Sequence, residues 1–329
     1  MTVKQLQNKI MNSVRNFLSV YDLTAGEMYD ILSRAALLKA DRTLGGGYLK
    51  GKKIGLIFEK SSTRTRVSFE VGVAELGGYP IFMSPRDMQL GRGEPIKDTA
   101  RVLSRYIDGA VIRTFEQARI EEFAVYFKKP VINGLTDLYH PAQILADIFT
   151  VYEAKSKMRN NTKKAVDAVA GDAGDIIKNL KIAYFGDANN MANSWISLQA
   201  VMGFELVLAM PDGFKADERV ARESGKRGGR FSVSHDKISA AEDADVITTD
   251  VFISMGQEDN KEKIDKLKPF IIDDGVIGSA KKDVIFLHCL PVHRNEEVTE
   301  AVFERFSPYV FEEAENRLHV QKAIMEMLF

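Results

Sequence analysis

The sequence has a single cysteine, no long apolar run and almost no net charge, and each shortage excludes a class of protein. Cys289 alone forms neither an internal disulfide nor a thiolate-rich metal cluster, which suits a reducing cytoplasmic compartment. No apolar segment approaches the roughly 20 residues of a membrane-spanning helix, so we expect a soluble protein without a membrane partner. The 45 Lys and Arg against 46 Asp and Glu give a formal charge of -1, so no overall basic field attracts nucleic acid. Any anion site must therefore be local.

The first twenty residues carry three basic side chains and no acidic one, a composition that weakly resembles a transit peptide. Leu6, Ile10 and Phe17 stand at near-helical spacing, however, and the segment is poor in serine. We therefore favour a docked N-terminal helix over a targeting segment.

Short apolar runs alternate with amphipathic, helix-like stretches along the chain, and a chain of 329 residues suits two domains of ordinary size. This alternation predicts an α/β fold of parallel sheets, in which ligands bind at the carboxyl ends of the strands. A polar, glycine-containing segment at 155–175 predicts a domain junction with an exposed loop. The last residues, 312–329, are expected to form a helix. The expected strands are Ile54–Phe58, Ala110–Arg113, Val131–Asn133, Lys181–Phe185, Glu205–Ala209, Asp245–Thr249 and Val284–His288.

The hexapeptide SSTRTR at 61–66 lies between an expected strand and an expected helix. Its hydroxyl residues are good N-cap types, and the amino end of a helix attracts anions. Arg64 adds a forked donor suited to phosphate, while Ser62, Thr63 and Thr65 add hydroxyl donors. A capped helix with solvated arginines is the alternative, and Arg66 is expected to pair with Glu70 one turn on.

Three more donors follow expected strands. Arg113 closes one strand, and His140 and Gln143 follow the next through a turn in which Pro141 is placed to begin a helix. Imidazole and guanidinium groups stabilise a carbonyl oxygen that gains negative charge. His140 by itself would also suit a helix cap or a core position.

The second half places a different chemistry after its strands. Asn190, Asp250 with Ser254, Met255 and Gly256, and Cys289 with Leu290 offer an amide, a carboxylate, a hydroxyl and turn amides, a set suited to an amino acid zwitterion. His288, Cys289 and His293 could suggest zinc, but neighbours on an extended strand point to opposite faces. Cys289 as a covalent nucleophile, or as a small buried residue, also remains open.

Two nucleotide-binding patterns are incomplete. The segment 46–53 has P-loop spacing but lacks the Ser/Thr and precedes a strand, and 186–195 lacks two of the glycines of a dinucleotide fingerprint. We expect neither nucleotide binding nor any other cofactor.

Several separated motifs together resemble the aspartate/ornithine carbamoyltransferase family, and within it the ornithine enzymes, over nearly the whole chain. The motifs are SSTRTR at 61–66, MQLGRGEPIKDTARVLSR at 88–105, Arg113, HPAQ at 140–143, GDANNMANS at 186–194, DVFISMG at 250–256, HCLP at 288–291 and AENR at 314–317.

The resemblance implies two domains joined by two interdomain helices: a carbamoyl phosphate-binding domain at 1–153 with the helix 312–329, and an ornithine-binding domain at 154–311. It implies carbamoyl phosphate and L-ornithine as substrates, L-citrulline and phosphate as products, and a homotrimer with shared sites in arginine biosynthesis. Thr65, Arg113, His140 and Cys289 would be catalytic. Carbamoyl phosphate would contact Ser62, Thr63, Arg64, Thr65, Gln89 from a neighbouring subunit, Arg113, His140, Gln143, Cys289, Leu290 and Arg317, and ornithine would contact Asn190, Asp250, Ser254 and Met255.

Ser254-Met255-Gly256 favours ornithine over putrescine, which has no carboxylate, and Asp250 disfavours aspartate as the acceptor. A non-catalytic carbamoyl phosphate sensor with the same fold is the alternative from another class. Both reaction directions, citrulline synthesis and its catabolic reverse, are compatible with the sequence.

Overall fold

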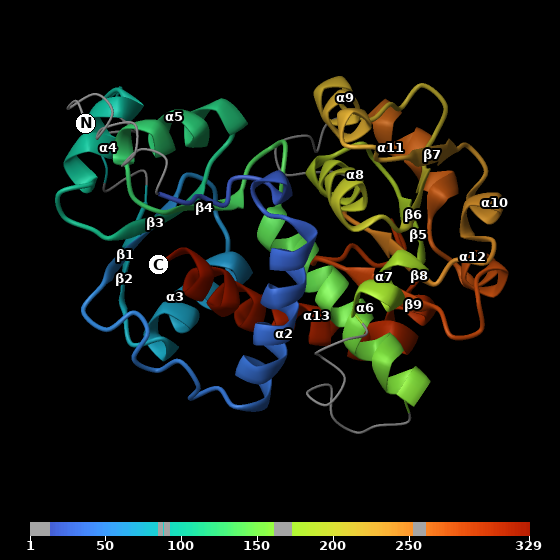
Figure 1. Cartoon of the computed structure of the whole chain (residues 1–329). Coiled ribbons are helices and arrows are strands. Elements are labelled where there is room, and N and C mark those ends of the chain that lie inside the picture. The colour runs from blue at the N-terminus through green and yellow to red at the C-terminus, as the bar shows by residue number, and fades with distance from the viewer. Residues whose placement is uncertain (1–13, 85–87, 89–92, 161–172, 253–260) are drawn as a thin grey trace. The chain divides into compact units, whose positions relative to one another are not determined.

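The computed structural model describes residues 14–84, 88, 93–160, 173–252 and 261–329. The chain forms two compact units, a first unit of Met1–Ala142 with Arg317–Phe329 and a second unit of Gln143–Asn316. Two helices, α6 (Pro141–Asn160) and α13 (Glu300–Leu328), run through the two boundaries (Figure 1). Pro141 begins α6, as the sequence predicts.

The first unit is built on a four-stranded parallel sheet of order β2-β1-β3-β4. Its strands are β1 (Lys53–Phe58), β2 (Tyr79–Met83), β3 (Gly109–Arg113) and β4 (Val131–Leu135). Its helices, besides the parts of α6 and α13, are η1 (Val20–Asp22), α2 (Ala25–Ala40), α3 (Arg64–Glu75), α4 (Ile96–Leu103) and α5 (Gln117–Phe127). Because the chain runs outward from β1 to β2 and then returns to β3, the crevice between β1 and β3 is the expected ligand position.

Helices cover both faces of this sheet (Figure 1). On one face, apolar side chains of β1 and β3 pack with α4 and α5, among them Ile112 and Phe123. On the other face, α3 packs so closely against α13 that a Cβ atom at Gly72 would lie 3.1 Å from Met325 Cε. The buried Lys322 of α13 also donates to Glu75 of α3 at 2.8 Å. This contact fixes the last helix against α3, the helix that begins within the SSTRTR segment.

The second unit contains a five-stranded parallel sheet of order β7-β6-β5-β8-β9. Its strands are β5 (Lys181–Phe185), β6 (Glu205–Ala209), β7 (Phe231–Ser234), β8 (Val246–Thr249) and β9 (Ile285–His288). Its further helices are α7 (Ala173–Lys178), α8 (Asn190–Met202), α9 (Glu218–Lys226), α10 (Lys237–Ala241), α11 (Lys261–Leu267), η4 (Lys268–Phe270) and α12 (Asp274–Ser279). Phe185, Ile247 and Phe286 belong to the core between the sheet and α10, α12 and α13. Here the strand order reverses between β5 and β8, so the crevice between these two strands is the expected ligand position.

The structure confirms the α/β class and all seven expected strands, and it adds β2 and β7 at the sheet edges. The expected loop begins later than predicted, because α6 continues through 155–160. Lys155 is buried there and donates to Asp283 Oδ2 at 2.8 Å, while 161–172 lie outside the described residues.

Most of the predicted N-terminal helix, residues 1–13, lies outside the described residues. Phe17 is fully buried and forms a parallel bridge with Ile132 of β4. Among the described helices, none combines the length and apolar character needed to cross a bilayer.

Candidate active site

The turn after β1 leads directly into α3, as the sequence predicts. The helix begins at Arg64, and Thr63 occupies the cap position, but its backbone is α-helical and its side chain caps no described amide. The hydroxyl therefore does not act as the predicted cap, and the first-turn amides stay available to an anion. Ser62 is half-buried, whereas Thr63 and Arg64 are exposed.

The two arginines of the hexapeptide differ in their surroundings. Arg66 pairs with Glu70 at 3.1 Å, which confirms the prediction, and its guanidinium lies 3.5 Å from the centre of the Phe82 ring. Arg64 is exposed at the first position of α3, where its charge adds to the positive end of the helix.

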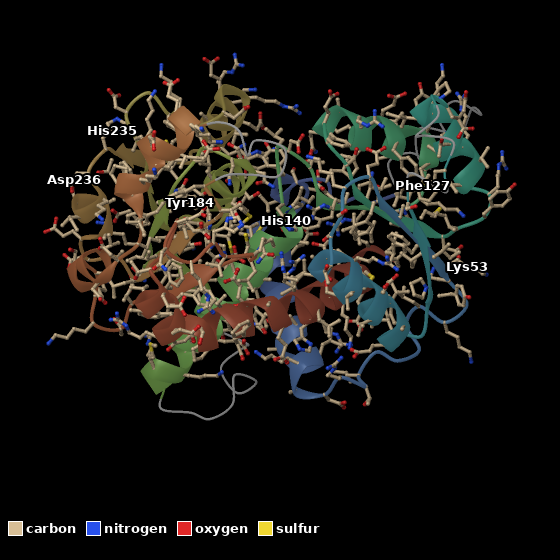
Figure 2. All side chains as sticks on the ribbon, turned by 180° about the vertical axis from the view of Figure 1, so that it is seen from behind. Lys53, Phe127, His140, Tyr184, His235 and Asp236 are labelled. Atoms are coloured by element: carbon tan, nitrogen blue, oxygen red, sulfur yellow. The ribbon has the colours of Figure 1, made fainter. Side chains whose placement is uncertain are left out.

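A buried group of donors forms the rest of the site in the first unit. Arg317 of α13 donates from Nη2 to the hydroxyl of Thr65, and both residues are buried. Arg113 is the last residue of β3 and is in register with Phe58, the last residue of β1. Arg113 is therefore buried at a strand end adjacent to the one that leads into α3. His140, labelled in Figure 2, immediately precedes α6 and is 5% exposed.

Burial, and then the charges of Arg317 and Arg113, hold the pKa of His140 well below its usual 6.5. The imidazole is therefore neutral at physiological pH. A neutral imidazole near two guanidinium groups donates one N–H and adds no charge of its own, so this group of side chains suits an anionic or carbonyl-bearing ligand.

The turns that carry these residues are tied together by side chains that the sequence interpretation did not single out. Glu59, directly after β1, accepts from the Thr114 hydroxyl and from Arg119 Nη2 at 2.8 Å. Lys60 donates to Asp137, in the turn after β4, at 2.6 Å. The three strand ends are thus cross-linked by a carboxylate and an ammonium group. No spacing rule marks Glu59, because its partners come from turns distant in sequence.

Gln143 belongs to the second unit in its described contacts. Its amide nitrogen donates to Asp147 Oδ1 at 2.7 Å and to Glu313 Oε1 at 2.9 Å, and all three residues are buried. Glu313 also accepts from the amide of His288 at 2.9 Å. Gln143 therefore links α6, α13 and the end of β9.

The carboxyl ends of β5, β8 and β9 bring the second set of predicted residues together. Phe185 is in register with Thr249, and Thr249 with His288, so the residues that follow these strands are neighbours. Cys289 Sγ donates to Asp250 Oδ1 at 3.2 Å. Asn190 is the first residue of α8, and the adjacent Asn189 donates to Asp250 Oδ2 at 2.8 Å.

Gly186 makes this arrangement possible at the end of β5. Its φ of 123° is a backbone conformation that residues with a side chain rarely adopt, and it starts the turn that carries the chain from β5 to Asn189. Leu290, half-buried at the other side of the group, donates its amide to His288 Nδ1 at 2.9 Å.

The titratable groups beside Asp250 are held in their neutral forms. Burial, followed by the charges of Asp250, Glu313 and Asp147, raises the pKa of the Cys289 thiol well above 9.0. Burial and then Asp250 raise the pKa of Tyr184 well above 10.0. The raised pKa of Cys289 disfavours the thiolate that a covalent nucleophile needs. Asp250 is the carboxylate of the set.

The side chains of the HCLP motif diverge. His288 places Nε2 3.3 Å from Glu297 Oε1 in the core, whereas the Cys289 thiol bonds to Asp250. This matches the alternation expected for an extended strand end, which was the argument against a shared zinc ion.

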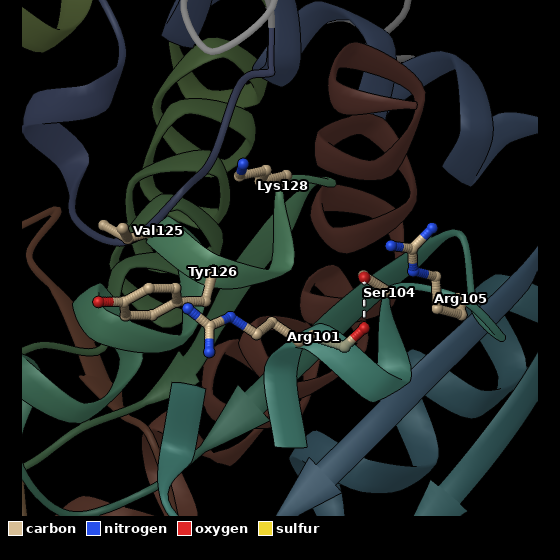
Figure 3. Close-up of a pocket in the computed structure, with 6 residues that line it drawn as sticks. All are labelled: Arg101, Ser104, Arg105, Val125, Tyr126 and Lys128. Carbon is tan, nitrogen blue, oxygen red and sulfur yellow. Dashed lines mark hydrogen bonds between the residues drawn. The ribbon is translucent and has the colours of Figure 1, made fainter. Parts of the chain in front are cut away.

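A separate pocket of about 520 Å³ lies beside α4 and α5 (Figure 3). Its lining residues are Arg101, Ser104, Arg105, Val125, Tyr126 and Lys128. Ser104 and Arg105 precede β3 and Lys128 precedes β4, so the pocket is at the amino-end side of the sheet. Arg101 is already engaged, with Asp98 at 3.1 Å and over the Tyr126 ring at 4.8 Å. The predicted ligand groups are at the opposite, carboxyl end.

Three predicted site residues, Gln89, Ser254 and Met255, lie outside the described residues.

Comparisons with known proteins match two regions of the chain to one family. Residues 15–153 match the family model for the aspartate/ornithine carbamoyltransferase carbamoyl-P binding domain, and residues 178–328 match that for the Asp/Orn binding domain. The chain belongs to the aspartate/ornithine carbamoyltransferase family.

Several relatives and structural neighbours are ornithine carbamoyltransferases. The ornithine carbamoyltransferase of Geobacter sulfurreducens is 47% identical over 319 residues, which cover 96% of this chain and 99% of the relative. That of Pelobacter propionicus is 48% identical, over 95% of this chain and 98% of the relative. The crystal structure of the anabolic enzyme from Campylobacter jejuni has a TM-score of 0.84 at 40% identity, covering 95% of this chain and 98% of that one. The Pyrococcus furiosus enzyme has a TM-score of 0.82 at 42% identity, covering 94% and 96%.

Proposed function

We propose that this chain transfers the carbamoyl group of carbamoyl phosphate to the δ-amine of L-ornithine, giving L-citrulline and phosphate. The observation that carries the proposal is the opposite charge of the two strand-end groups. In the first unit, the charges of Arg113 and of Arg317 from α13 help to keep His140 neutral, and Arg113 and His140 lie in the region that matches the carbamoyl-P binding domain. Asp250 is the anionic group in the region that matches the Asp/Orn binding domain.

In this proposal the first unit binds carbamoyl phosphate. The free amides and positive end of α3 receive the phosphate, with the guanidinium of Arg64 and the nearby hydroxyls as further donors. Arg317, bonded to Thr65, supplies a second cation from α13. The proposed ligand contacts are Ser62, Thr63, Arg64, Thr65, Arg113, His140, Gln143, Cys289, Leu290 and Arg317, with Gln89 supplied by a neighbouring subunit.

The second unit binds the amino acid. Asp250 attracts the α-ammonium group of ornithine, while Asn190 and the turn with Ser254 and Met255 bind its carboxylate and backbone atoms. A carboxylate at Asp250 supports an acceptor with an ammonium group and argues against a dicarboxylic amino acid.

The reaction forms one bond and breaks one. The neutral δ-amine attacks the carbamoyl carbon, and the carbonyl oxygen takes the electron pair while Thr65, Arg113 and His140 donate to it. The bond from carbon to the phosphate oxygen then breaks, and the amine proton passes to the leaving phosphate. No electron acceptor and no cofactor enter the balance.

The wider setting belongs to the same proposal: a cytoplasmic homotrimer with shared sites in arginine biosynthesis. The biosynthetic direction is supported by the anabolic enzyme of Campylobacter jejuni, to which this chain is similar.

A phosphate-release assay tests the activity. Purified protein is incubated with carbamoyl phosphate and, separately, ornithine, putrescine, N-acetylornithine or aspartate. We expect release with ornithine far above the other acceptors, together with formation of citrulline. Preference for another acceptor would contradict the substrate assignment, and no release with any of them would support the sensor alternative.

A further inference from the structure

We propose that Asn189, supported by Tyr184, is a positioning residue that orients the carboxylate of Asp250 and thereby sets the affinity for the acceptor amino acid. The inference rests on the proposed function, since it concerns the same acceptor site. Asn189 precedes Asn190, the residue that the motif suggests as the direct contact. The two neighbours have different tasks.

The bonds of Asp250 fix both of its oxygen atoms. Oδ2 accepts from Asn189 Nδ2 at 2.8 Å, and Oδ1 accepts from the Val251 amide at 2.8 Å and from the Cys289 thiol at 3.2 Å. A carboxylate has about four lone-pair sites, so positions remain for an ammonium group. Among the described residues, Asn189 is the donor to Oδ2, and its loss would leave the carboxylate held through Oδ1 alone.

The contacts of the Asn189 side chain determine which way its amide points. Its Oδ1 accepts from the amides of Met191 and Ala192 at 2.9 and 3.2 Å, at the first turn of α8. It also accepts from the hydroxyl of the buried Tyr184 at 2.9 Å. Backbone amides can only donate, so the oxygen must face the helix and the NH₂ group must face Asp250.

Asn189 thus combines two roles that different substitutions separate. As an acceptor it caps α8, a role that aspartate fills equally well. As a donor it holds Asp250, a role that aspartate cannot fill when ionised. An Asn189→Asp variant therefore keeps the cap and removes the positioning bond, while it adds a like charge beside Asp250.

Steady-state kinetics with each substrate varied in turn test the inference. For Asn189→Asp we expect the KM for ornithine to rise about ten- to hundredfold, because a hydrogen bond to a charged group is lost and a repulsion is added. The KM for carbamoyl phosphate should stay close to the wild-type value, while the melting temperature should fall only through the added repulsion, because the cap of α8 is kept. Because two adjacent carboxylates share a proton as the pH falls, the ornithine KM of this variant should recover partly below neutral pH.

Two further variants serve as controls. Asn189→Ala loses the cap and the positioning bond together, so both the melting temperature and the ornithine KM should change. Tyr184→Phe removes only the hydroxyl that supports Asn189, and we expect a rise of a few-fold in the ornithine KM.

An unchanged ornithine KM in Asn189→Asp would overturn the inference, as would equal changes in the KM values of both substrates. If the wild-type chain turns over with ornithine, such a result sinks the positioning role and leaves the proposed function intact. A wild-type chain inactive with every amino acid acceptor would overturn both.

Discussion

The strand ends of the two units use the same architecture with opposite charge. In the first unit, buried cations surround a histidine and lower its pKa, so the imidazole stays neutral. In the second unit, burial and then the charge of Asp250 raise the pKa values of a thiol and a phenol, so these groups stay neutral as well. Burial disfavours the charged form in both places, and the neighbouring charges act in the same direction as burial. The first unit thereby presents positive charge to its ligand, and the second unit negative charge. The neutral histidine, thiol and phenol add no charge of their own.

The two units also hold their charged groups differently. In the first, Arg317 comes from the last helix, and Glu59 and Lys60 cross-link turns that are distant in sequence. In the second, a chain of hydrogen bonds runs from Tyr184 through Asn189 to Asp250 and Cys289. Both groups are thus fixed by contacts between residues distant in sequence, the cationic group through a helix contact and ion pairs and the carboxylate through a chain of hydrogen bonds. Substitutions in the two units should therefore affect different kinetic parameters.

The largest expected effect comes from the cationic side. Arg64→Ala removes the forked donor at the start of α3, and we expect turnover to fall on the order of a hundredfold or more, because a preorganised donor to developing negative charge is lost. The KM for carbamoyl phosphate should rise, since the same group binds the phosphate in the ground state. Steady-state phosphate release measures both parameters.

Arg66→Ala is the matched control in the same hexapeptide. Arg66 makes a half-buried ion pair with Glu70 and lies over the Phe82 ring, so its removal should change stability by about 1–2 kcal/mol and leave turnover near the wild-type value. If the two variants lose turnover equally, the division between a ligand-binding and a structural arginine is wrong.

A smaller effect is expected on the carboxylate side. Asp250→Asn removes the anionic group of the acceptor site, and we expect the KM for ornithine to rise about ten- to hundredfold while the KM for carbamoyl phosphate changes little. The substitution also removes one of the charges that raise the Cys289 pKa, so the thiol should ionise at lower pH.

Alkylation of the single cysteine by iodoacetamide gives this second effect a direct measurement. The rate at pH 8 should be higher in Asp250→Asn than in the wild type, because the thiolate is the reacting form. An equal or lower rate would show that Asp250 does not control the thiol.

The sequence predicted those parts of the fold that depend on local pattern. Every strand with a buried apolar run was found, whereas β2 and β7 are edge strands with few fully buried residues, so they lacked that signal. Pro80 in β2 weakened it further, because proline cannot donate to a ladder.

Site residues were predictable from the sequence where they directly follow an expected strand. They were not predictable where their role depends on contacts with residues distant in sequence. Thr65 and Arg317 were expected to act at one ligand, and the structure shows them bonded to each other. Asn189 and Glu59 escaped notice, because their importance depends on partners from other turns. The motif has two adjacent asparagines, Asn189 and Asn190, and the sequence alone did not show which of them caps α8.

The smallest expected effect concerns stability against pH, and it distinguishes the two units by the direction of the change. The folded-state pKa of His140 is lowered, so above about pH 6.5 the side chain is neutral in both states, and below that value the unfolded chain binds a proton that the folded chain resists. Stability from neutral burial of His140 is therefore fully present above pH 6.5 and is lost as the pH falls, by at most about 1.4 kcal/mol per pH unit.

Urea unfolding of the wild type and of His140→Gln at pH 7.5, 6.5 and 5.5 isolates this contribution, since the variant lacks the titrating group. We expect the wild type to lose more stability than the variant between pH 6.5 and 5.5, and parallel curves would contradict the neutral imidazole. The Cys289 thiol has the opposite sign, because its folded pKa is raised: its contribution is present below 9.0 and is lost only as the pH rises further. A Cys289→Ser variant should therefore diverge further from the wild type in alkali.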